Sequence, residues 1–490
     1  MLFLITLFLR IELVGYYNNN LGGIETNVIY GIQRLLLGQP LYQDPASGSY
    51  AVLQYTPLYY VVAAHCATLL HIHALDVQGI YSLCRVLALA FNLLTILIAA
   101  GIIRGWGISW LWSLTCALPV LILLTSHYYT RGDSMHLLFF VAAAGCYVSF
   151  LRRAHRPWLL AAALSSAACI MTKQSGVLAV GIIGCSLFFS RGRYLQAITF
   201  GILAMLFCFA LAMLCTGGDL YGLYRNACLG LKNGTDFSYL YQLFISQFYT
   251  DMVPCYLLAA AMAWMGTAKI KDNSYSFLVT GIVMSWFFAV ITGVKNGSSN
   301  NYFVEFLTLL IIALPCLFQH AASNKRLLRL PRYDLTVRSL GCIALFILVT
   351  SKTLGFFTAM YLDKSIRNNS AEYAHEEQLY NYFINNLHLQ KGEHILFTER
   401  NFLDNLFIEY SVMPTKDVVS ETYLADHTTF NYSAYEAGQN NGLVRYIVAD
   451  ARKKDMDRWH EQIPFMHPDM TKFDRMVDTC GYSIYRYSIK

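Results

Sequence analysis

Long apolar runs, repeated from the N-terminus to about residue 361, limit what this 490-residue chain can fold into more than any other feature. A transmembrane helix needs about 20 mostly apolar residues. The candidate spans lie at about 2–16, 80–103, 109–127, 135–151, 157–172, 175–190, 195–216, 251–268, 275–294, 302–318 and 337–361. Charged residues make up only 13% of the chain, whereas a soluble domain carries roughly 25%. So few charges cannot cover a large water-facing surface, and we therefore predict a polytopic membrane protein.

Basic residues lie in short clusters between the apolar runs, and they indicate the orientation of the chain. If the N-terminus is cytoplasmic and the spans alternate, every dense cluster falls on the cytoplasmic side, as the positive-inside rule expects. The clusters are Arg104, Arg152 with Arg153 and Arg156, Arg191 with Arg193, Lys269 with Lys271, and Lys325 with Arg326, Arg329 and Arg332. These loops account for the formal net charge of +6, so nucleic-acid binding is not needed to explain it. An odd number of spans then places the C-terminal part on the outer face.

The first outer loop, residues 17–79, contains two helical segments that we expect to lie along the membrane surface. In 25–37, apolar side chains line one helical face and polar side chains the other, which is typical of an interfacial helix. The apolar ones are Val28, Ile29, Ile32, Leu35 and Leu36, and the polar ones are Asn27, Gln33 and Arg34. The apolar segment 58–72 would reverse the side of every later loop if it spanned the membrane, so we expect a second interfacial helix there.

The C-terminal tail has the composition of a soluble domain. Its β-rich runs lie at 394–398, 446–449 and 483–489, and its helical stretches at 403–410 and 456–462. We therefore predict an all-α polytopic membrane domain, residues 1–361, with about eleven transmembrane helices plus interfacial helices, and a small extracytoplasmic α/β domain, residues 362–490. Cys480 is the only cysteine in the tail, so no disulfide is expected within it.

Charged and amide side chains gather at the ends of the predicted spans, in four segments that the topology places on the outer face. They are Glu25 in the first loop, Arg131 and Asp133 after the third span, Lys173 and Gln174 in the next outer turn, and Lys295, Asn301, Tyr302 and Glu305 in a later one. An ionised group at mid-bilayer costs roughly 2.5–3.5 kcal/mol on insertion scales. Cations bind phosphate, and a carboxylate takes a proton from an acceptor hydroxyl. The set suits transfer of a group from a membrane-anchored phosphate ester to a hydroxyl.

Each charged residue of the set also has a purely structural explanation. Glu25 and Asp133 would both suit the first turn of a helix, where the dipole favours an acid, and Arg131 would simply pair with Asp133. Lys173 would extend its ammonium group to the membrane surface. Glu305, which enters a helix between two apolar residues, would pair with a lysine, either Lys173 or the lysine at position 295.

Sequence signatures of several other chemistries do not occur in this chain. It has no P-loop, no G-x-S-x-G elbow and no H-E-x-x-H helix. His127 and His136 flank the Asp133 turn, but spacing alone does not make them metal ligands. We expect them to be solvated or core histidines.

Five short motifs follow one another along residues 17–310. They are Gly23-Ile24-Glu25 with the later Gly38-Gln39-Pro40-Leu41-Tyr42-Gln43-Asp44, then Tyr55-Thr56-Pro57-Leu58-Tyr59-Tyr60, Arg131-Gly132-Asp133, Thr172-Lys173-Gln174-Ser175-Gly176, and the stretch KNGSSNNYFVE at 295–305. In these motifs the chain resembles the GT-C class of membrane glycosyltransferases, and more closely the bacterial relatives of the dolichyl-phosphate-mannose protein mannosyltransferases and the aminoarabinose transferases. It departs from them at Ile24, where many relatives carry Asp before Glu, and at Gly132, where they carry Pro.

The resemblance implies a GT-C-like fold and an enzyme, a hexosyl or pentosyl transferase that uses a polyprenyl-phosphate-linked sugar donor and usually inverts the anomeric centre. An acid of the first outer loop is the base in such enzymes, so Glu25 takes that role, with Asp133 as a second catalytic residue that orients the acceptor or the cations. The predicted donor-phosphate ligands are Lys173, Arg131 and Lys295, and the predicted substrate-binding residues are Gln174, Asn301, Tyr302 and Glu305.

The expected partners are the lipid-linked donor, a glycan, lipid or protein acceptor and the lipid bilayer, with no nucleic acid. Some relatives bind a divalent metal, and nothing in these residues requires one. The resemblance favours the bacterial inner membrane, with the site and the C-terminal domain extracytoplasmic; an archaeal membrane is the alternative.

Two other classes of function compete with an enzyme. A transporter or flippase of lipid-linked saccharides would carry charges at mid-membrane on several helices and some repeat symmetry, whereas the acids here lie at outer turns. A sensor or scaffold would bind through its outer domain, and its outer turns would tolerate mutation.

Overall fold

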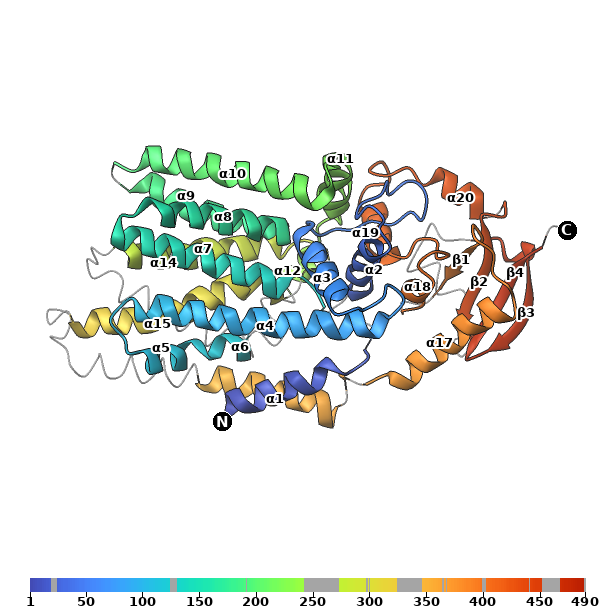
Figure 1. The fold of residues 1–490 in the computed structure, drawn as a ribbon, viewed down its shortest axis with the longest axis horizontal. Coiled ribbons are helices and arrows are strands. Elements are labelled where there is room, and N and C mark those ends of the chain that lie inside the picture. The colour runs from blue at the N-terminus through green and yellow to red at the C-terminus, as the bar shows by residue number, and fades with distance from the viewer. Residues whose placement is uncertain are drawn as a thin grey trace.

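The protein is mostly helical, with one small sheet near the C-terminus (Figure 1). The computed structural model describes residues 1–18, 24–123, 130–190, 192–241, 273–296, 298, 300–323, 346–363, 365–366, 368–398, 402–439, 441–451 and 468–488. The helices of the first part are α1 (Leu2–Val14), α2 (Glu25–Leu36), α3 (Leu58–Leu69), α4 (Val77–Arg104), α5 (Trp110–Ala117), α6 (Pro119–Leu123), α7 (Asp133–Arg153), α8 (Arg156–Thr172), α9 (Val177–Phe189), α10 (Tyr194–Thr216), α11 (Leu220–Leu223), α12 (Phe237–Tyr241), α14 (Asn273–Thr292) and α15 (Val304–Ser323).

Four of the described helices, α4, α7, α10 and α14, are long and apolar enough to cross a membrane. Shorter apolar helices occupy several other predicted spans, and the one expected at 109–127 begins as two short helices, α5 and α6. Pro119 begins the second of them, where its missing N–H does no harm to a first helical turn. The predicted span 251–268 lies outside the described residues, so the total of about eleven stays a prediction.

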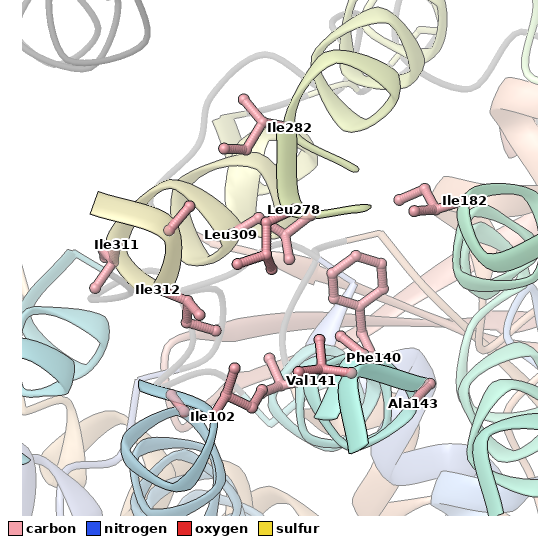
Figure 2. Close-up of a cluster of buried hydrophobic side chains, with 14 of the residues drawn as sticks. Ile102, Phe140, Val141, Ala143, Ile182, Leu278, Ile282, Leu309, Ile311 and Ile312 are labelled. Carbon is pink, nitrogen blue, oxygen red and sulfur yellow. The ribbon is translucent and has the colours of Figure 1, made fainter. Parts of the chain in front are cut away.

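The bundle packs around α7. Figure 2 shows Phe140 of α7 near Leu278 of α14 and Leu309 of α15, and all three are almost fully buried. On α8, which packs against α7, Ala162 and Ala163 are completely buried. Small residues let helices approach closely, and dispersion between close-packed side chains is the main attraction available where the surroundings are as apolar as the helices themselves.

The amphipathic segment predicted at 25–37 forms α2, but its polar face does not lie in water. Gln33 is completely buried, and its Nε2 donates to the carbonyl oxygens of Ala74 (2.7 Å) and Asn405 (2.9 Å). Arg34 donates through Nε to the carbonyl of Pro40 at 2.9 Å. Buried polar groups need such partners. The predicted helix is present, and its polar face packs against the chain, including its C-terminal part.

The C-terminal part contains a four-stranded mixed sheet in the order β1-β2-β4-β3. Its elements are α17 (Ser370–Asn385), β1 (His394–Phe397), α18 (Leu403–Leu406), α19 (Lys416–Ala425), α20 (Ser433–Gln439), β2 (Val444–Asp450), β3 (Phe473–Thr479) and β4 (Tyr482–Tyr487). β1 pairs parallel to β2, which pairs antiparallel to β4, with Val448 opposite Ile484. β3 and β4 form a hairpin whose turn residues, Cys480 and Gly481, both have positive φ, as a tight hairpin turn requires.

The predicted strands at 394–398, 446–449 and 483–489 correspond to β1, β2 and β4, and β3 was missed. β3 lies at one edge of the sheet, and most of its side chains are exposed or half-exposed, so it lacks the apolar alternation that marks a strand in sequence. The predicted helix at 403–410 is the shorter α18, and the one at 456–462 lies outside the described residues.

One hydrophobic core joins the first helices to the sheet. It includes Ile29 of α2 and Tyr59 of α3 together with Phe383 of α17 and Ile484 of β4. The α2–α3 region is thus covered on one side by the C-terminal part, and the polar turns discussed below lie close to this junction.

Candidate functional site

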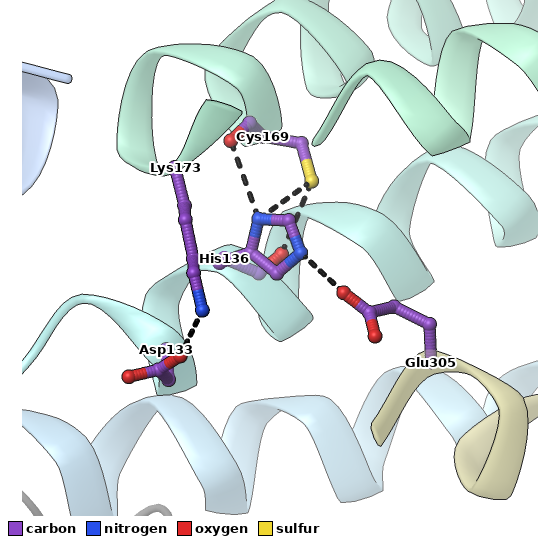
Figure 3. Close-up of polar contacts among 5 residues, drawn as sticks. All are labelled: Asp133, His136, Cys169, Lys173 and Glu305. Atoms are coloured by element: carbon purple, nitrogen blue, oxygen red, sulfur yellow. Dashed lines mark hydrogen bonds and ion pairs between the residues drawn. The ribbon is translucent and has the colours of Figure 1, made fainter. Parts of the chain in front are cut away.

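The turn before α7 meets the end of α8 through an ion-pair cluster. Asp133, the first residue of α7, accepts from Lys173 Nζ at 2.7 Å through Oδ1, and its Oδ2 lies 3.0 Å from Arg131 Nε. Figure 3 shows the Asp133 and Lys173 side chains pointing at one another. Both side chains are largely buried, and buried charges persist in proteins where they are paired. The structure thus brings together three of the predicted site residues.

The glycine of Arg131-Gly132-Asp133 stands where two other segments come close. A Cβ at Gly132 would lie 3.2 Å from Tyr59 Cβ and 3.3 Å from Thr172 Cγ2. These contacts are tighter than usual, so a larger residue would press the turn away from α3 and α8. The absence of a side chain therefore allows the Asp133 turn to lie against the residue that precedes Lys173.

Glu25 is the first residue of α2, and it follows a strained residue. Ile24 has φ +48°, which is unfavourable for a β-branched side chain, and strained residues of this kind cluster at functional sites. The Glu25 side chain is completely buried. Its Oε1 accepts the backbone N–H of Thr130 at 2.8 Å, and its Oε2 accepts the Tyr81 hydroxyl at 2.9 Å. Because Thr130 directly precedes Arg131, Glu25 lies beside the turn that carries Asp133.

Tyr81 and Arg85 of α4 hold Glu25 in place through hydrogen bonds, and neither residue was identified in the sequence analysis. Tyr81 donates to Glu25, and Arg85 Nη2 donates to the Tyr81 hydroxyl at 2.5 Å from one turn further along α4. Arg85 Nη1 also donates to the carbonyls of Leu13 and Tyr16, at 2.5 and 2.6 Å. The signal was present in the sequence: Arg85 is a charge inside the predicted span 80–103, and such charges mark functional sites by default.

Lys173 lies in a pocket of opposite charge and aromatic rings. Burial by itself lowers the proton affinity of its ammonium group, but the Asp133 carboxylate and the phenols of Tyr55 and Tyr302 hold the pKa of Lys173 above its ordinary value. The Lys173 Nζ lies 5.4 Å from the centre of the Tyr302 ring, within cation–π range. Lys173 is therefore a permanent cation, and Tyr302 lies beside it.

Lys295 is carried by a short two-stranded bridge. It pairs antiparallel with Thr235, and the N–H of Asn296 donates to the carbonyl of Gly234 at 3.2 Å. Burial lowers the pKa of Lys295 to about 8, the carboxylate of Glu421 in α19 acts to raise it, and the charge of Lys173 acts to lower it further. The two lysines are thus close enough to repel one another.

The structural explanation of Glu305 proposed an ion pair with Lys173 or Lys295, but its partner is a histidine. Its Oε1 lies 2.7 Å from Nε2 of His136, one turn after Asp133 on α7. His136 Nδ1 lies 3.3 Å from Cys169 Sγ on α8, and Figure 3 shows the imidazole between the two. His136 is a core histidine, as expected, and it links α7, α8 and α15 beneath the Asp133–Lys173 pair.

The remaining predicted substrate ligands are placed differently. Gln174 donates through Nε2 to the carbonyls of Gln54 and Ala227, the latter at 2.8 Å, so its amide already ties the first loop to a later segment. Asn301 directly precedes Tyr302, and its buried Oδ1 has no hydrogen-bond partner within the described chain. His127 lies outside the described residues.

The described residues do not offer a metal site. No three His, Cys, Asp or Glu side chains within this part of the chain gather as ligands. Both oxygens of Glu25 accept hydrogen bonds, and Asp133 pairs with Lys173 and Arg131.

No protein-family model and no curated protein matches this sequence significantly, but solved structures share its fold. ArnT from Cupriavidus metallidurans, in a crystal structure bound to undecaprenyl phosphate, matches with a TM-score of 0.58 and 12% identity, over 99% of this chain and 97% of that one. The oligosaccharyltransferase of Archaeoglobus fulgidus in complex with Zn and sulfate matches with a TM-score of 0.53 and 10% identity, over 100% of this chain and 73% of that one.

A third structure is archaeal oligosaccharyltransferase AglB from Archaeoglobus fulgidus, in complex with an inhibitory peptide and a dolichol-phosphate. It matches with a TM-score of 0.56 and 10% identity, over 99% of this chain and 74% of that one. At such low identity the likeness shows the fold alone, and it agrees with the GT-C-like fold that the sequence motifs predict. Similar folds carry different functions, so function has to be argued from the site.

Proposed function

We propose that this protein is a membrane glycosyltransferase that moves a sugar from a polyprenyl-phosphate-linked donor to an acceptor hydroxyl, with inversion at the anomeric carbon. The observation that carries the proposal is the convergence of Glu25, Arg131, Asp133 and Lys173 at one junction. Neighbours of the same fold bound to undecaprenyl phosphate and to a dolichol-phosphate support the class of donor. The acceptor would be a glycan, lipid or protein.

In the proposed reaction Glu25 takes the proton of the acceptor hydroxyl, and the freed oxygen attacks the anomeric carbon of the sugar. The bond from that carbon to the phosphate oxygen breaks, and the polyprenyl phosphate leaves with the electron pair. A single displacement of this kind inverts the anomeric centre. The sugar arrives already linked to its lipid, so no nucleotide is cleaved.

The cations suit the leaving group. Lys173, Arg131 and Lys295 with the one carboxylate of Asp133 carry a net charge of +2 when all are ionised. A phosphate monoester carries about −1.5 to −2 at neutral pH. Because Asp133 already holds two of the cations in place, little reorganisation is needed as charge develops on the phosphate.

Glu25 must be uncovered before it acts as a base, because its side chain is buried in this structure. Tyr81 and the Thr130 N–H fix its two oxygens, which orients the carboxylate but leaves no oxygen without a partner. We propose that the acceptor hydroxyl replaces one of these two donors. The site would lie on the extracytoplasmic side, as the basic loops predict, and the resemblance of the motifs favours a bacterial inner membrane.

The test is transfer by purified protein supplied with a radiolabelled polyprenyl-phosphate sugar and membrane acceptors. Glu25→Gln should abolish transfer while the protein stays folded. Glu377→Gln, the same exchange at an exposed position of α17, is the matched control and should remain active. Near-full activity of Glu25→Gln would remove Glu25 as the base. Movement of intact lipid-linked sugar across vesicles without transfer would instead support a flippase.

A further inference from the structure

The segment between α11 and α12 is paired with the backbone around Lys295, although the segment and Lys295 are far apart in sequence. Thr235 pairs with Lys295, and the N–H of Asp236 donates to the carbonyl of Val294 at 2.8 Å. Together with the Asn296 bond to Gly234, these contacts fasten the backbone around Lys295 to residues 234–236. Whatever holds that segment therefore also sets the position of Lys295.

Helix α19 of the C-terminal part, at the junction of the bundle and the sheet (Figure 1), holds the segment from one side. Glu421 Oε2 accepts from Asn233 Nδ2 at 2.6 Å, and Asn233 is almost completely buried. A Cβ at Gly234, whose φ is +77°, would lie 3.4 Å from Ala425 Cβ. Asp426 adds an ion pair with Lys232, at 3.4 Å on the surface.

The first loop holds the segment from the other side. Gln54 donates through Nε2 to Asn233 Oδ1 at 3.1 Å and to the carbonyl of Gly230 at 3.0 Å. The phenol of the next residue, Tyr55, interacts electrostatically with Arg131, Asp133 and Lys173. Asn233 therefore stands between Glu421 and the loop that borders the ion-pair cluster. The amide oxygen of Asn233 accepts from Gln54 in the first loop, and its amide nitrogen donates to Glu421 in α19.

Glu421 also acts on Lys295 through its charge. Among the described groups, Glu421 on α19 raises the proton affinity of Lys295 and Lys173 at the end of α8 lowers it. Burial is the largest influence, and it leaves Lys295 near half-protonation at about pH 8. A nearby carboxylate that favours the charged form therefore increases the fraction of Lys295 that is a cation near pH 8.

We propose that Glu421 is a positioning residue for the donor-phosphate site: through Asn233 it holds the segment that is paired with the backbone of Lys295, and its carboxylate serves as a counter-charge to the Lys295 ammonium group until a phosphate binds. The inference rests on the proposed function. It makes the C-terminal part a component of donor binding, in addition to any part that it has in acceptor binding.

The test measures binding of undecaprenyl phosphate to the full-length protein in nanodiscs, at several pH values on both sides of pH 8. Wild-type affinity should fall as the pH rises through about 8. Glu421→Gln should shift this fall to lower pH and weaken binding at pH 8 by roughly threefold to fivefold, since a half-protonated group loses most of its charged fraction for each unit of proton affinity lost. Glu377→Gln, the same exchange at an exposed position of α17, should leave the curve unchanged.

A merely structural role for Glu421 would weaken binding equally at every pH and would not move the midpoint. Glu421→Asp keeps the charge on a shorter side chain, so it should restore the midpoint even where affinity stays low. In a Lys295→Arg background the fall near pH 8 should vanish, and Glu421→Gln should no longer shift anything. An unmoved midpoint in Glu421→Gln, with wild-type protein that binds the lipid, would overturn this inference alone. A wild-type protein that binds no polyprenyl phosphate would overturn the proposed function with it.

Discussion

Asp133 is the residue that organises the cations. Its two oxygens face Lys173 and Arg131 at 2.7 and 3.0 Å in a largely buried setting. An amide in its place would keep the shape but leave two neighbouring cations without a carboxylate. Mutual repulsion and loss of the charged hydrogen bonds would then move both donors away from the phosphate position.

We therefore expect Asp133→Asn to lower the transfer rate by roughly 10²-fold, the size of effect that misplacement of a catalytic group by about 1 Å produces. The melting temperature should also fall, since the Asp133 carboxylate is the shared ion-pair partner of two largely buried cations. Steady-state transfer kinetics and thermal unfolding measure the two effects. Asp219→Asn, at the residue that caps α11 away from the cluster, is the control. Asp133→Asn with wild-type kinetics would show that Asp133 serves the fold only.

Glu376 on α17 gives the protein a pH-dependent stability of its own. Burial raises the pKa of Glu376 to about 8, although the Tyr17 hydroxyl donates to its Oε2 at 2.8 Å; Glu372 and Asp404 raise it as well. A folded-state pKa above the unfolded value near 4.5 means that the folded form holds the proton more tightly. The stabilisation is complete below about pH 4.5 and is lost as the pH rises through about 8.

Glu376→Gln, which is neutral at every pH, should remove this dependence. The difference in unfolding free energy between mutant and wild type should change by up to about 1.4 kcal/mol per pH unit between pH 5 and pH 8, in favour of the mutant at higher pH. Thermal or denaturant unfolding in detergent, repeated across that range, gives the difference curve. Two parallel curves would mean that Glu376 has an ordinary proton affinity in the folded protein.

At the level of elements, the sequence predicted helices and polar turns better than it predicted their partners. The turns at Arg131–Asp133 and Lys173 were found because charges at the ends of apolar runs are conspicuous. The contact of Glu25 with Tyr81, 56 residues along the chain, and that of Asn233 with Glu421, 188 residues along, depend on tertiary packing. Local patterns carry no record of such pairs.

The same limit applies to the polar face of α2, whose partners the sequence does not reveal. An amphipathic helix reads alike whether its polar face meets water or a polar surface of the same chain, because only the pattern and not the partner is visible. Gln33 satisfies its amide with carbonyls of Ala74 and Asn405. The number of polar side chains does not distinguish the two cases either, because a buried, hydrogen-bonded helical face needs polar side chains as much as an exposed face does.

The packing of Gly132, in the turn before α7, against α3 and α8 leads to a testable prediction. Gly132→Ala would place a Cβ 3.2 to 3.3 Å from Tyr59 and Thr172, and the turn would have to move by a few tenths of an ångström. Overpacking of this kind costs about 1–3 kcal/mol, and the shift of Asp133 should reduce transfer by roughly tenfold. Gly184→Ala, in α9 with open space around it, should be neutral in unfolding and transfer assays. Equal behaviour of the two variants would contradict the packing argument.

At the scale of the whole molecule, the C-terminal part and the first loop share one core, and together they cover the end of the bundle that holds the cluster. α7 runs from Asp133 at this end to Arg153 at the other. Its 21 residues span about 30 Å, which equals the thickness of the hydrocarbon core of a bilayer. The two ends of α7 should therefore face opposite sides of the membrane, and the basic loops predict that the Arg153 end is cytoplasmic.

Thiol labelling tests this orientation directly. In a cysteine-free background, Cys228, which is exposed, and Cys480, in the β3–β4 turn, would each be restored singly. A membrane-impermeant maleimide should label both in intact spheroplasts. A cysteine placed by Arg153→Cys should react only after permeabilisation, because Arg153 lies at the far end of α7. The reverse pattern would put the C-terminal part in the cytoplasm: the ion-pair cluster would stand, but the donor would have to be used on the side where it is made, and the extracytoplasmic location of the proposed transfer would be wrong.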